Sequence, residues 1–252
     1  RDVADIIVRE GDLGALPRGV EQGRTNLSNI RKSVHCIIST NLSEIFVLLA
    51  ESLIAGDQLE TPLELLWVNL VTDILPGLGL ALEPPERSIM HTPPRGPDEP
   101  LLTMRDLKYS ALESAVIAGF VLAAHGYGLS RYGPGPHTRT VTFMSLVAAQ
   151  LTHALACRHD RFKPLGGRTL FGNRNLNRAL IASAALQGLA IVSPTAHRLL
   201  GIARPHPIDL AVAATTALSA FAVNEVILAS RSAPRPPDVA PYPPRGRHPW
   251  QN

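Results

Sequence analysis

The sequence is short of cysteine and of aromatic residues. It has two cysteines, Cys36 and Cys157, and only 5% of its 252 residues are Phe, Trp or Tyr. Both cysteines lie near the ends of apolar runs that we assign to the cytoplasmic side. That compartment is reducing, so we predict packing residues rather than a disulfide or a metal-binding pair. Basic residues are not interleaved with aromatic ones, so we expect no nucleic-acid partner.

Charged residues are also scarce, at 18%, and they are unevenly distributed. A mean hydropathy near zero conceals long uncharged runs that alternate with loops rich in Arg, Pro and Gly. Six runs have roughly the 17–23 residues that a helix needs to cross a bilayer. Buried helices of a soluble bundle are the alternative, but six such runs in succession favour a mainly α, integral membrane protein. We predict a six-helix transmembrane bundle with spans at 34–56, 63–82, 108–130, 138–157, 176–196 and 208–230.

Six spans place both ends of the chain on the same side of the membrane. With that assignment, all but four of the 24 Lys and Arg residues lie on the side of the N-terminus; the exceptions are Arg131, Arg139, Arg198 and Arg204. Cytoplasmic loops carry the excess of basic residues. We therefore predict a multi-pass protein of the cell membrane, embedded in the lipid bilayer, with both ends of the chain in the cytoplasm.

The segments outside the spans differ in kind. Residues 3–8 have the pattern of a short buried strand, and a polar helical pattern from 16 to 32 runs without a break into the first span. We predict that 1–33 is the strand-helix remnant of a cytoplasmic α/β domain, so that the chain is a piece of a longer protein. The loop 83–106 is too rich in proline for regular structure. The Pro- and Arg-rich tail, 231–252, is predicted to be disordered.

Two of the predicted spans carry polar residues at mid-membrane depth. Asn41 and Glu44 are three residues apart, and Asn69, Thr72 and Asp73 follow an i, i+3, i+4 pattern, so each group lies on one helix face. A short loop joins the two spans, which predicts antiparallel packing with the polar faces in contact. An ionisable side chain at mid-bilayer costs about 2.5–3.5 kcal/mol. No Lys or Arg lies in these two spans, so we predict that a bound cation neutralises the acids.

The ligands offered by these residues are all oxygen atoms, which hard cations prefer. We expect Ca²⁺, Mn²⁺ or Mg²⁺; a monovalent ion would fit if one acid stayed protonated. Pro76 has no N–H, so the carbonyl of Thr72 loses its helical partner and becomes a further candidate ligand. Taken alone, the two asparagines could equally be hydrogen-bonding between helices. In the fourth span Gln150 is a candidate ligand, whereas His153 is expected to be a packing residue.

Other polar residues of the runs receive structural interpretations. Glu51 could line an exit path or sit in the outer membrane interface, and we favour the interface. Glu113 and Glu225, near cytoplasmic ends, are expected to touch water or Arg. His125 and Gln187 are expected to form hydrogen bonds between helices.

Several long motifs carry a resemblance to a known family. Those in the membrane part are EQGRTNLSNIRKSVHCIISTNLSEI, LELLWVNLVTDILPGLGLALEPPE and IMHTPPRGPDEPLLT. They closely resemble the last six membrane helices of P-type cation-transporting ATPases of the calcium-pump-like class. The opening VADIIVREGDLGALPRGVEQGR is similar to the final strand and helix of that family's phosphorylation domain. The resemblance spans nearly the whole chain and is most specific over residues 1–106.

The resemblance implies that 34–230 is a cation-transport domain in which the transported ion is bound by Asn41, Glu44, Asn69, Thr72 and Asp73. Gln150 stands where calcium pumps of the muscle type have an acid, which leaves the number of ions per cycle open between one and two. Ile74 replaces a usual glycine, so this helix is expected to unwind less than in relatives.

The sequence lacks the family's Asp-Lys-Thr-Gly-Thr phosphorylation motif, its nucleotide-binding domain and its fourth helix with Pro-Glu-Gly ligands. The resemblance implies that ATP and Mg²⁺ act in the missing N-terminal part of the same pump, where an aspartyl phosphate forms. We predict no catalytic or cofactor-binding residue in this chain, which would be the ion-translocating part of an ATP-driven metal-cation pump. The alternatives are an ATP-independent channel or carrier and a degenerate scaffold that transports nothing.

Overall fold

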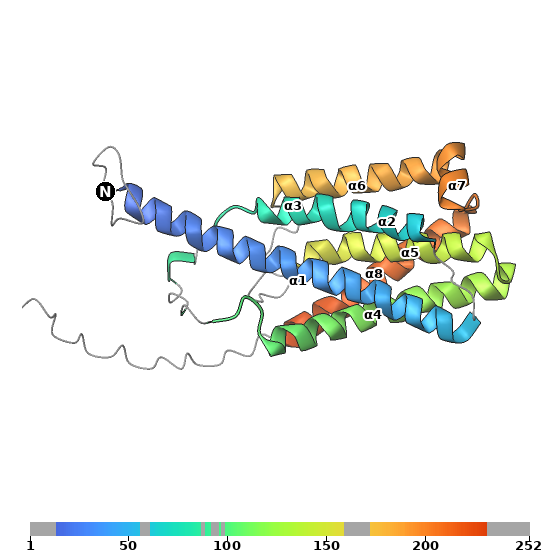
Figure 1. Cartoon of the computed structure of the whole chain (residues 1–252), viewed down its shortest axis with the longest axis horizontal. Coiled ribbons are helices and arrows are strands. Elements are labelled where there is room, and N and C mark those ends of the chain that lie inside the picture. The colour runs from blue at the N-terminus through green and yellow to red at the C-terminus, as the bar shows by residue number, and fades with distance from the viewer. Residues whose placement is uncertain are drawn as a thin grey trace, which may run out of the picture.

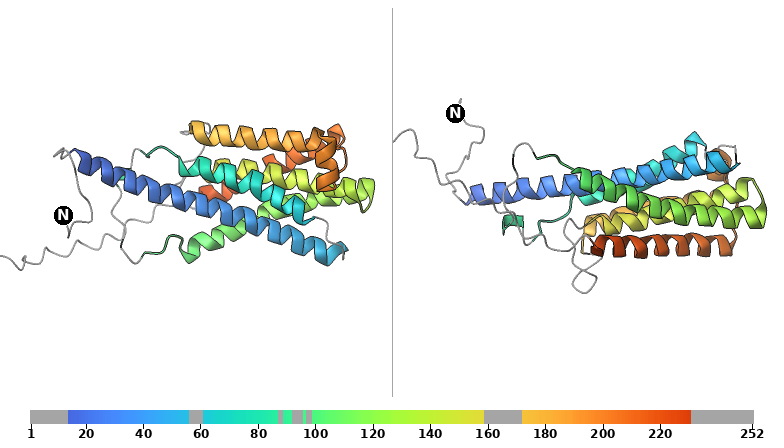
Figure 2. Two further views of the ribbon diagram at one scale, coloured as in Figure 1. Left: turned by 45° about the horizontal axis from the view of Figure 1, so that its top comes forward. Right: turned by 90° about the horizontal axis from the view of Figure 1, so that it is seen from below.

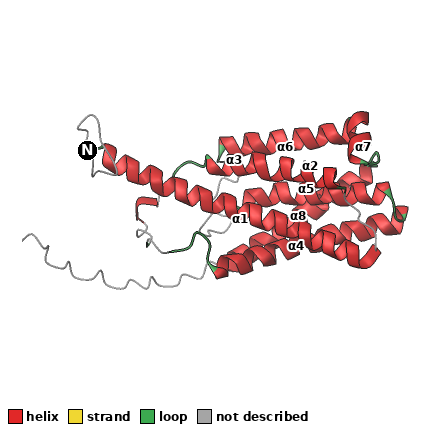
Figure 3. Ribbon diagram, viewed as in Figure 1, coloured by secondary structure: helices red, strands yellow, loops and turns green. Residues whose placement is uncertain are grey.

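The computed structural model describes residues 14–55, 61–86, 89–91, 96, 99–158 and 172–230. Every regular element in these segments is a helix, as Figure 3 shows. The mainly α fold that the sequence predicts is therefore confirmed. The predicted strand at 3–8 and the predicted disordered tail at 231–252 lie outside the described residues.

The helices form an elongated bundle, with one end of α1 protruding from it (Figure 1). In chain order the elements are α1 (Ala15–Ala55), α2 (Pro62–Asn69), the π-helical turn η1 (Leu70–Ile74), α3 (Leu75–Ala81), the 3₁₀ turn η2 (Ile89–His91), α4 (Met104–Tyr132), α5 (Pro136–Ala156), α6 (Arg174–Val192), α7 (Pro194–Leu200) and α8 (Pro207–Ser230).

Helix α1 runs for 41 residues without a break, as the sequence predicts for the cytoplasmic helix and the first span. Its N-terminal part extends beyond the bundle as a stalk, and the rest of the helix packs against α3 and α4. Polar contacts fix it where it enters the bundle: Arg31 pairs with Asp106 at 3.0 Å, and the Asn29 amide donates to the carbonyl of Glu83 at 2.7 Å. The helix is thus a continuous rod from the stalk into the bundle interior.

Local sequence signals explain where several helices begin. Thr61 and Thr103 form capping boxes with Glu64 and Asp106, in which each threonine oxygen accepts from the backbone of the acid and each acid accepts from the backbone of the threonine. Helix α6 is capped by Asn173, whose side-chain oxygen accepts two backbone N–H groups. These caps satisfy the first N–H groups of each helix.

Within the described segments, four helical units are long and apolar enough to cross a membrane: α1, the continuous α2–η1–α3 unit, α4 and α8. Helices α6 and α7 make a fifth if they are counted together, although they meet at a bend of 90°. The sequence predicts the fifth span, 176–196, as one helix. In the structure α6 ends at Val192, and a new helix, capped by Ser193, begins at Pro194. The multi-pass membrane character is confirmed.

The fourth predicted span, 138–157, corresponds to α5, which is not among the apolar candidates. Helix α5 can be less apolar because it lies between α1 on one side and α8 on the other, as Figure 2 shows. It packs against α4 and α8 and buries Thr138, Thr142, Ser145, Gln150 and His153. A helix surrounded by protein does not have to match the apolarity of lipid.

The stalk end of the bundle is held by the carboxylate of Glu83. Arg158 donates to it at 2.7 Å, and Asn173 donates to it as well as to the carbonyl of Gly79 at 3.0 Å. All three side chains of this cluster are buried. The contacts tie the end of α3 to the end of α5 and to the start of α6.

Helices α3 and α6 approach each other closely at Gly79. A Cβ atom at this position would lie 2.7 Å from the Cα of Leu176, closer than packed atoms allow. At Gly188 on α6 an added Cβ would meet no atom within 4 Å, so this glycine offers a matched comparison.

We expect Gly79→Ala to push α3 away from α6 and to lower the free energy of unfolding by about 1–3 kcal/mol, the cost of overpacking. Thermal unfolding of the purified protein in detergent measures the effect. Gly188→Ala should keep or slightly raise the midpoint, because alanine favours a helix more than glycine does. Equal midpoints for the two variants would contradict the close approach.

Candidate cation-binding site

The predicted site lies where α1 passes the π-helical turn η1. Pro76 has no N–H to give, and the α-helical ladder changes to π geometry over Leu70–Ile74, shortly before the proline. The helix stays continuous through this turn, from Pro62 to Ala81. The wider turn carries Thr72 and Asp73, so both side chains are presented by a distorted segment.

The carboxylate of Asp73 is held by side chains of α1. The hydroxyl of Thr40 lies 2.8 Å from Asp73 Oδ1, and the amide of Asn41 donates to Oδ2 at 2.6 Å. Thr72, on the same turn, lies 3.4 Å from Oδ1. Asn41 and Thr72 were predicted from the sequence, but Thr40 was missed. Its signal was present, since Thr40 precedes Glu44 by one helical turn and therefore shares its face.

The second acid, Glu44, is 5% exposed and is contacted by α5. Gln150, fully buried, directs its amide nitrogen to Glu44 Oε1 at 3.1 Å, to the carbonyl of Thr40 at 3.1 Å and to the hydroxyl of Ser43 at 3.2 Å. Gln150 thus reaches the predicted site, as a donor to the acid. Because Gln150 also contacts Thr40, whose hydroxyl lies on Asp73, the two acids belong to one chain of contacts.

Two amide oxygens at this place have no hydrogen-bond partner in the part of the chain that the structure describes. They are Oδ1 of Asn69 and Oε1 of Gln150, and both atoms are buried. A buried polar atom without a partner costs free energy, so such atoms call for a specific explanation. Oxygen atoms are also the ligands that a hard cation would use.

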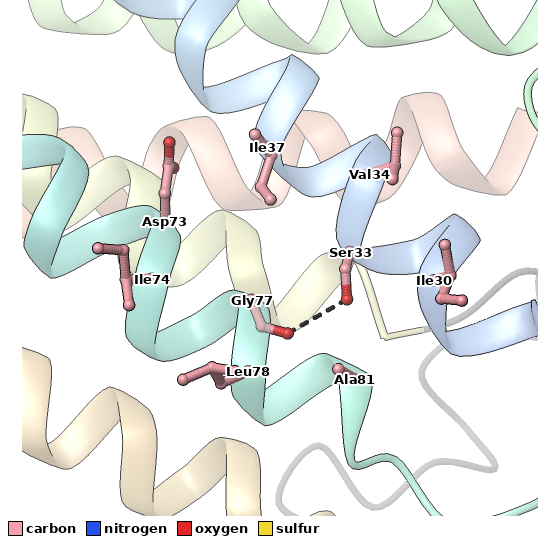
Figure 4. A pocket seen from close by; sticks show the side chains of 9 residues that line it. All are labelled: Ile30, Ser33, Val34, Ile37, Asp73, Ile74, Gly77, Leu78 and Ala81. Carbon is pink, nitrogen blue, oxygen red and sulfur yellow. Dashed lines mark hydrogen bonds between the residues drawn. The ribbon is translucent and has the colours of Figure 1, made fainter. Parts of the chain in front are cut away.

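A shallow, mostly apolar groove of about 340 Å³ lies between α1 and the η1–α3 segment (Figure 4). Asp73 lies at one end of its lining, and Ile30 and Ala81 lie toward the stalk. Ser33 bridges the two helices by donating to the carbonyl of Gly77 at 3.2 Å. The groove therefore leaves the neighbourhood of Asp73 open along the bundle surface.

The structure joins five of the six predicted site residues through hydrogen bonds: Asn41 and Thr72 contact Asp73, Gln150 contacts Glu44, and Gln150 also reaches Thr40 beside Asp73. Asn69, the last residue of α2, lies four residues before Asp73. Among the described residues no Lys or Arg forms an ion pair with Glu44 or Asp73. No group of three His, Cys, Asp or Glu side chains arranged to hold a metal is found there either. Any cation at this place would therefore be bound by two carboxylates and neutral oxygens.

Comparison with known proteins identifies the family. A model of the family described as cation transporting ATPase, C-terminus, matches residues 61–229, more than half of the chain. The chain belongs to this family.

Curated relatives of the chain agree with that assignment. It is 28% identical over 200 residues to a calcium-transporting ATPase of Bacillus subtilis, covering 77% of the chain and 22% of the relative. It is 29% identical over 236 residues to the probable cation-transporting ATPase F of Mycobacterium bovis and to that of Mycobacterium tuberculosis, covering 93% of the chain and 26% of each relative. The chain thus spans about a quarter of the length of these relatives.

The predictions for other polar residues of this family member are confirmed in some cases and wrong in others. Gln187 accepts from the indole of Trp67 at 2.9 Å and His125 bonds Thr142 at 2.9 Å, so both predicted interhelical hydrogen bonds are confirmed. The expectation that Glu113 touches water is wrong, because it is 2% exposed, and it lies 2.9 Å from Nε2 of His35.

Glu51 does not sit in the outer interface that we favoured, because it is 1% exposed inside the bundle. Cys36 and Cys157 are buried in one apolar cluster and form no disulfide, as predicted. Glu225 is also largely buried, at 9% exposure, rather than water-facing.

We expect Thr40→Val to destabilise the protein by about 1.5–3 kcal/mol, the value of a hydrogen bond to a charged group, because Asp73 loses a donor. Thermal unfolding in detergent measures the loss. Thr40→Ser should retain most of the stability. Thr215→Val removes a hydroxyl that bonds only its own helix, so it should have little effect. Similar losses for Thr40→Val and Thr215→Val would contradict the role of Thr40.

Proposed function

We propose that this chain is the ion-binding and translocation part of an ATP-driven cation pump. The observation that carries the proposal is that two acids from different helices, Glu44 and Asp73, are linked through Gln150 and Thr40 inside a membrane bundle, with no Lys or Arg ion-paired to either acid in the described chain. Two neighbouring carboxylates in a dry environment repel each other. A bound cation removes that repulsion.

The full ligand set that we propose consists of the two acids with Asn41, Asn69, Thr72 and Gln150. In the described arrangement the N–H groups of the Asn41 and Gln150 amides satisfy the acids. A half-turn of either amide about its last side-chain bond would present its oxygen in place of its nitrogen. The amides would then stabilise the carboxylates before a cation arrives and coordinate the cation afterwards.

The chemistry of this set favours a hard divalent cation as the transported substrate. Carboxylate, amide and hydroxyl oxygens suit Ca²⁺, Mn²⁺ and Mg²⁺, and two negative charges match one divalent ion. The relative from Bacillus subtilis is named for calcium, which favours Ca²⁺ among the three. The neutral Gln150 in place of a third acid favours one ion per cycle.

Coupling to ATP would come through α1, which runs unbroken from the stalk to Asn41 and Glu44. We propose that 1–33 ends a cytoplasmic domain, that 34–230 is the transport domain with both its ends facing the cytoplasm, and that 231–252 is a cytoplasmic tail. ATP and Mg²⁺ would act in the remaining part of the longer protein. The groove beside Asp73 would receive a further membrane helix of that part.

The test is the cation dependence of ATP hydrolysis by the full-length protein in proteoliposomes, with Ca²⁺, Mn²⁺ and Mg²⁺ varied separately. We expect Glu44→Gln and Asp73→Asn each to raise the half-saturating concentration of the activating cation at least about tenfold, or roughly 1.4 kcal/mol of lost binding. The reason is that each variant removes one of two charges from the site.

Glu113→Gln is the control, since it alters a buried acid of the same bundle outside the proposed ligand set. It should leave the half-saturating concentration unchanged. Activation by the same cation at the wild-type concentration in both site variants would refute the site. Cation flux that needs no ATP would point instead to a channel or carrier, and the absence of any cation-dependent activity would point to a scaffold.

A further inference from the structure

A second acid of α1 lies buried inside the bundle, away from the proposed cation site. Glu51 follows Glu44 by seven residues, or two helical turns and about 10 Å along the helix, on the same face. Its side chain is 1% exposed, and neither carboxylate oxygen accepts a hydrogen bond within the described chain. An ionised carboxylate in such surroundings would be strongly destabilised.

The charged and titratable groups that face Glu51 come from three neighbouring helices. His125 of α4 places its Nδ1 atom 3.3 Å from Glu51 Oε1. Glu64 of α2 and Arg139 of α5 also act on Glu51 electrostatically, with opposite signs. Glu64 and Arg139 pair with each other, Nη2 to Oε2, at 2.5 Å. Their charges compensate each other, which leaves no positive charge for Glu51.

The contacts around His125 favour the neutral form of its ring. The hydroxyl of Thr142 lies 3.1 Å from the carbonyl of Thr138 and 2.9 Å from Nδ1 of His125. Both contacts are satisfied when Thr142 donates to that carbonyl and accepts from a protonated Nδ1 of the neutral ring. Nε2 is buried and has no partner in the described chain, so a second proton there would be a buried charge without an acceptor. His125 is consequently neutral and cannot supply the charge that an ionised Glu51 would need.

We propose that Glu51 holds a proton in this closed arrangement, and that Glu51 with the neighbouring His125 forms a proton-binding site separate from Glu44 and Asp73. The ligand of this site is a single proton on the Glu51 carboxyl group. When water reaches the site, the O–H bond breaks, the proton passes to water and the carboxylate remains.

The site lies toward the end of the bundle at which α4 ends and α5 begins, opposite the stalk (Figure 1). A neutral Glu51 offers no second negative charge to hold a cation that leaves Glu44 in that direction, whereas a hydrated and ionised Glu51 would. This consequence rests on the proposed transport function, but the protonation of Glu51 does not, and its test below uses no transported cation.

Thermal unfolding of the full-length protein distinguishes the neutral acid Glu51 from the ion-paired acid Glu64. Glu51→Gln replaces a neutral acid by a neutral amide and removes the cost of holding a proton that the unfolded chain has lost, so we expect the midpoint at neutral pH to equal or exceed that of the wild type. Glu64→Gln leaves the charge of Arg139 without its partner, so we expect a loss of several degrees. A loss for Glu51→Gln as large as that for Glu64→Gln would overturn the proposal.

The pH dependence has a definite sign. Above a pH of about 4.3, at which a solvated glutamate ionises, the folded protein would hold a proton that the unfolded chain has lost. Stability of the wild type should therefore fall relative to Glu51→Gln as the pH rises toward alkaline values. A difference between the two midpoints that does not change with pH would count against a proton on Glu51.

Infrared spectroscopy observes the proton directly. We expect a protonated-carboxyl C=O band at neutral pH that is lost in Glu51→Gln and kept in Glu44→Gln and Asp73→Asn. If Glu51→Gln does not fold, Glu51→Met serves for the assignment. A spectrum in which removal of Glu51 deletes carboxylate bands and leaves every C=O acid band in place would overturn the proposal, whatever the fate of the cation site.

Discussion

The hydrogen bonds from α1 to the carboxylate of Asp73 are the interaction around which the site is arranged. Asp73 sits on a π-helical turn ahead of Pro76, and Thr40 and Asn41 reach it from the neighbouring helix. In water, a carboxylate that loses a hydrogen bond from the protein gains one from solvent, so the protein's hydrogen bond contributes little to stability. Inside a membrane bundle no solvent replaces it, so the donors of α1 determine where the two helices meet.

The same constraint explains why the polar residues of this bundle occur in sets. Glu44 is hydrogen-bonded to Gln150, Glu64 to Arg139, and His125 to Thr142. Each set joins two different helices, and each lies inside the bundle rather than on its lipid-facing surface. Exposed positions of the helices are instead occupied by large apolar residues such as Leu53, Ile181 and Val226.

The helix pattern and the two-helix core of the site could be predicted from the sequence, because both follow from local spacing. Uncharged runs of spanning length indicated the helices, and the i, i+3, i+4 spacing placed Asn69 and Asp73 on one face. Contacts to a third helix could not be derived in this way. The burial of Glu51 depends on where α4 and α5 pack, and no spacing within α1 contains that information.

Other differences have the same origin. The bend between α6 and α7 depends on the Ser193 cap and the following proline, which the hydropathy of the run conceals. Thr40 was overlooked because a threonine in a membrane helix usually bonds its own backbone, and it became a site residue only once Asp73 was placed opposite it. Glu113 was assigned to water by its position near a helix end, but neighbouring helices cover it.

The central claim, a cation shared by Glu44 and Asp73, is tested most directly by the anomalous scattering of bound Mn²⁺ or Ca²⁺ in crystals of the full-length protein. The account predicts one peak at roughly 2.0–2.6 Å from carboxylate oxygens of both residues, with at least one amide oxygen of Asn69 or Gln150 turned toward it. A bound ion that contacts neither carboxylate, with Asp73 still held by Thr40 and Asn41, would contradict the account.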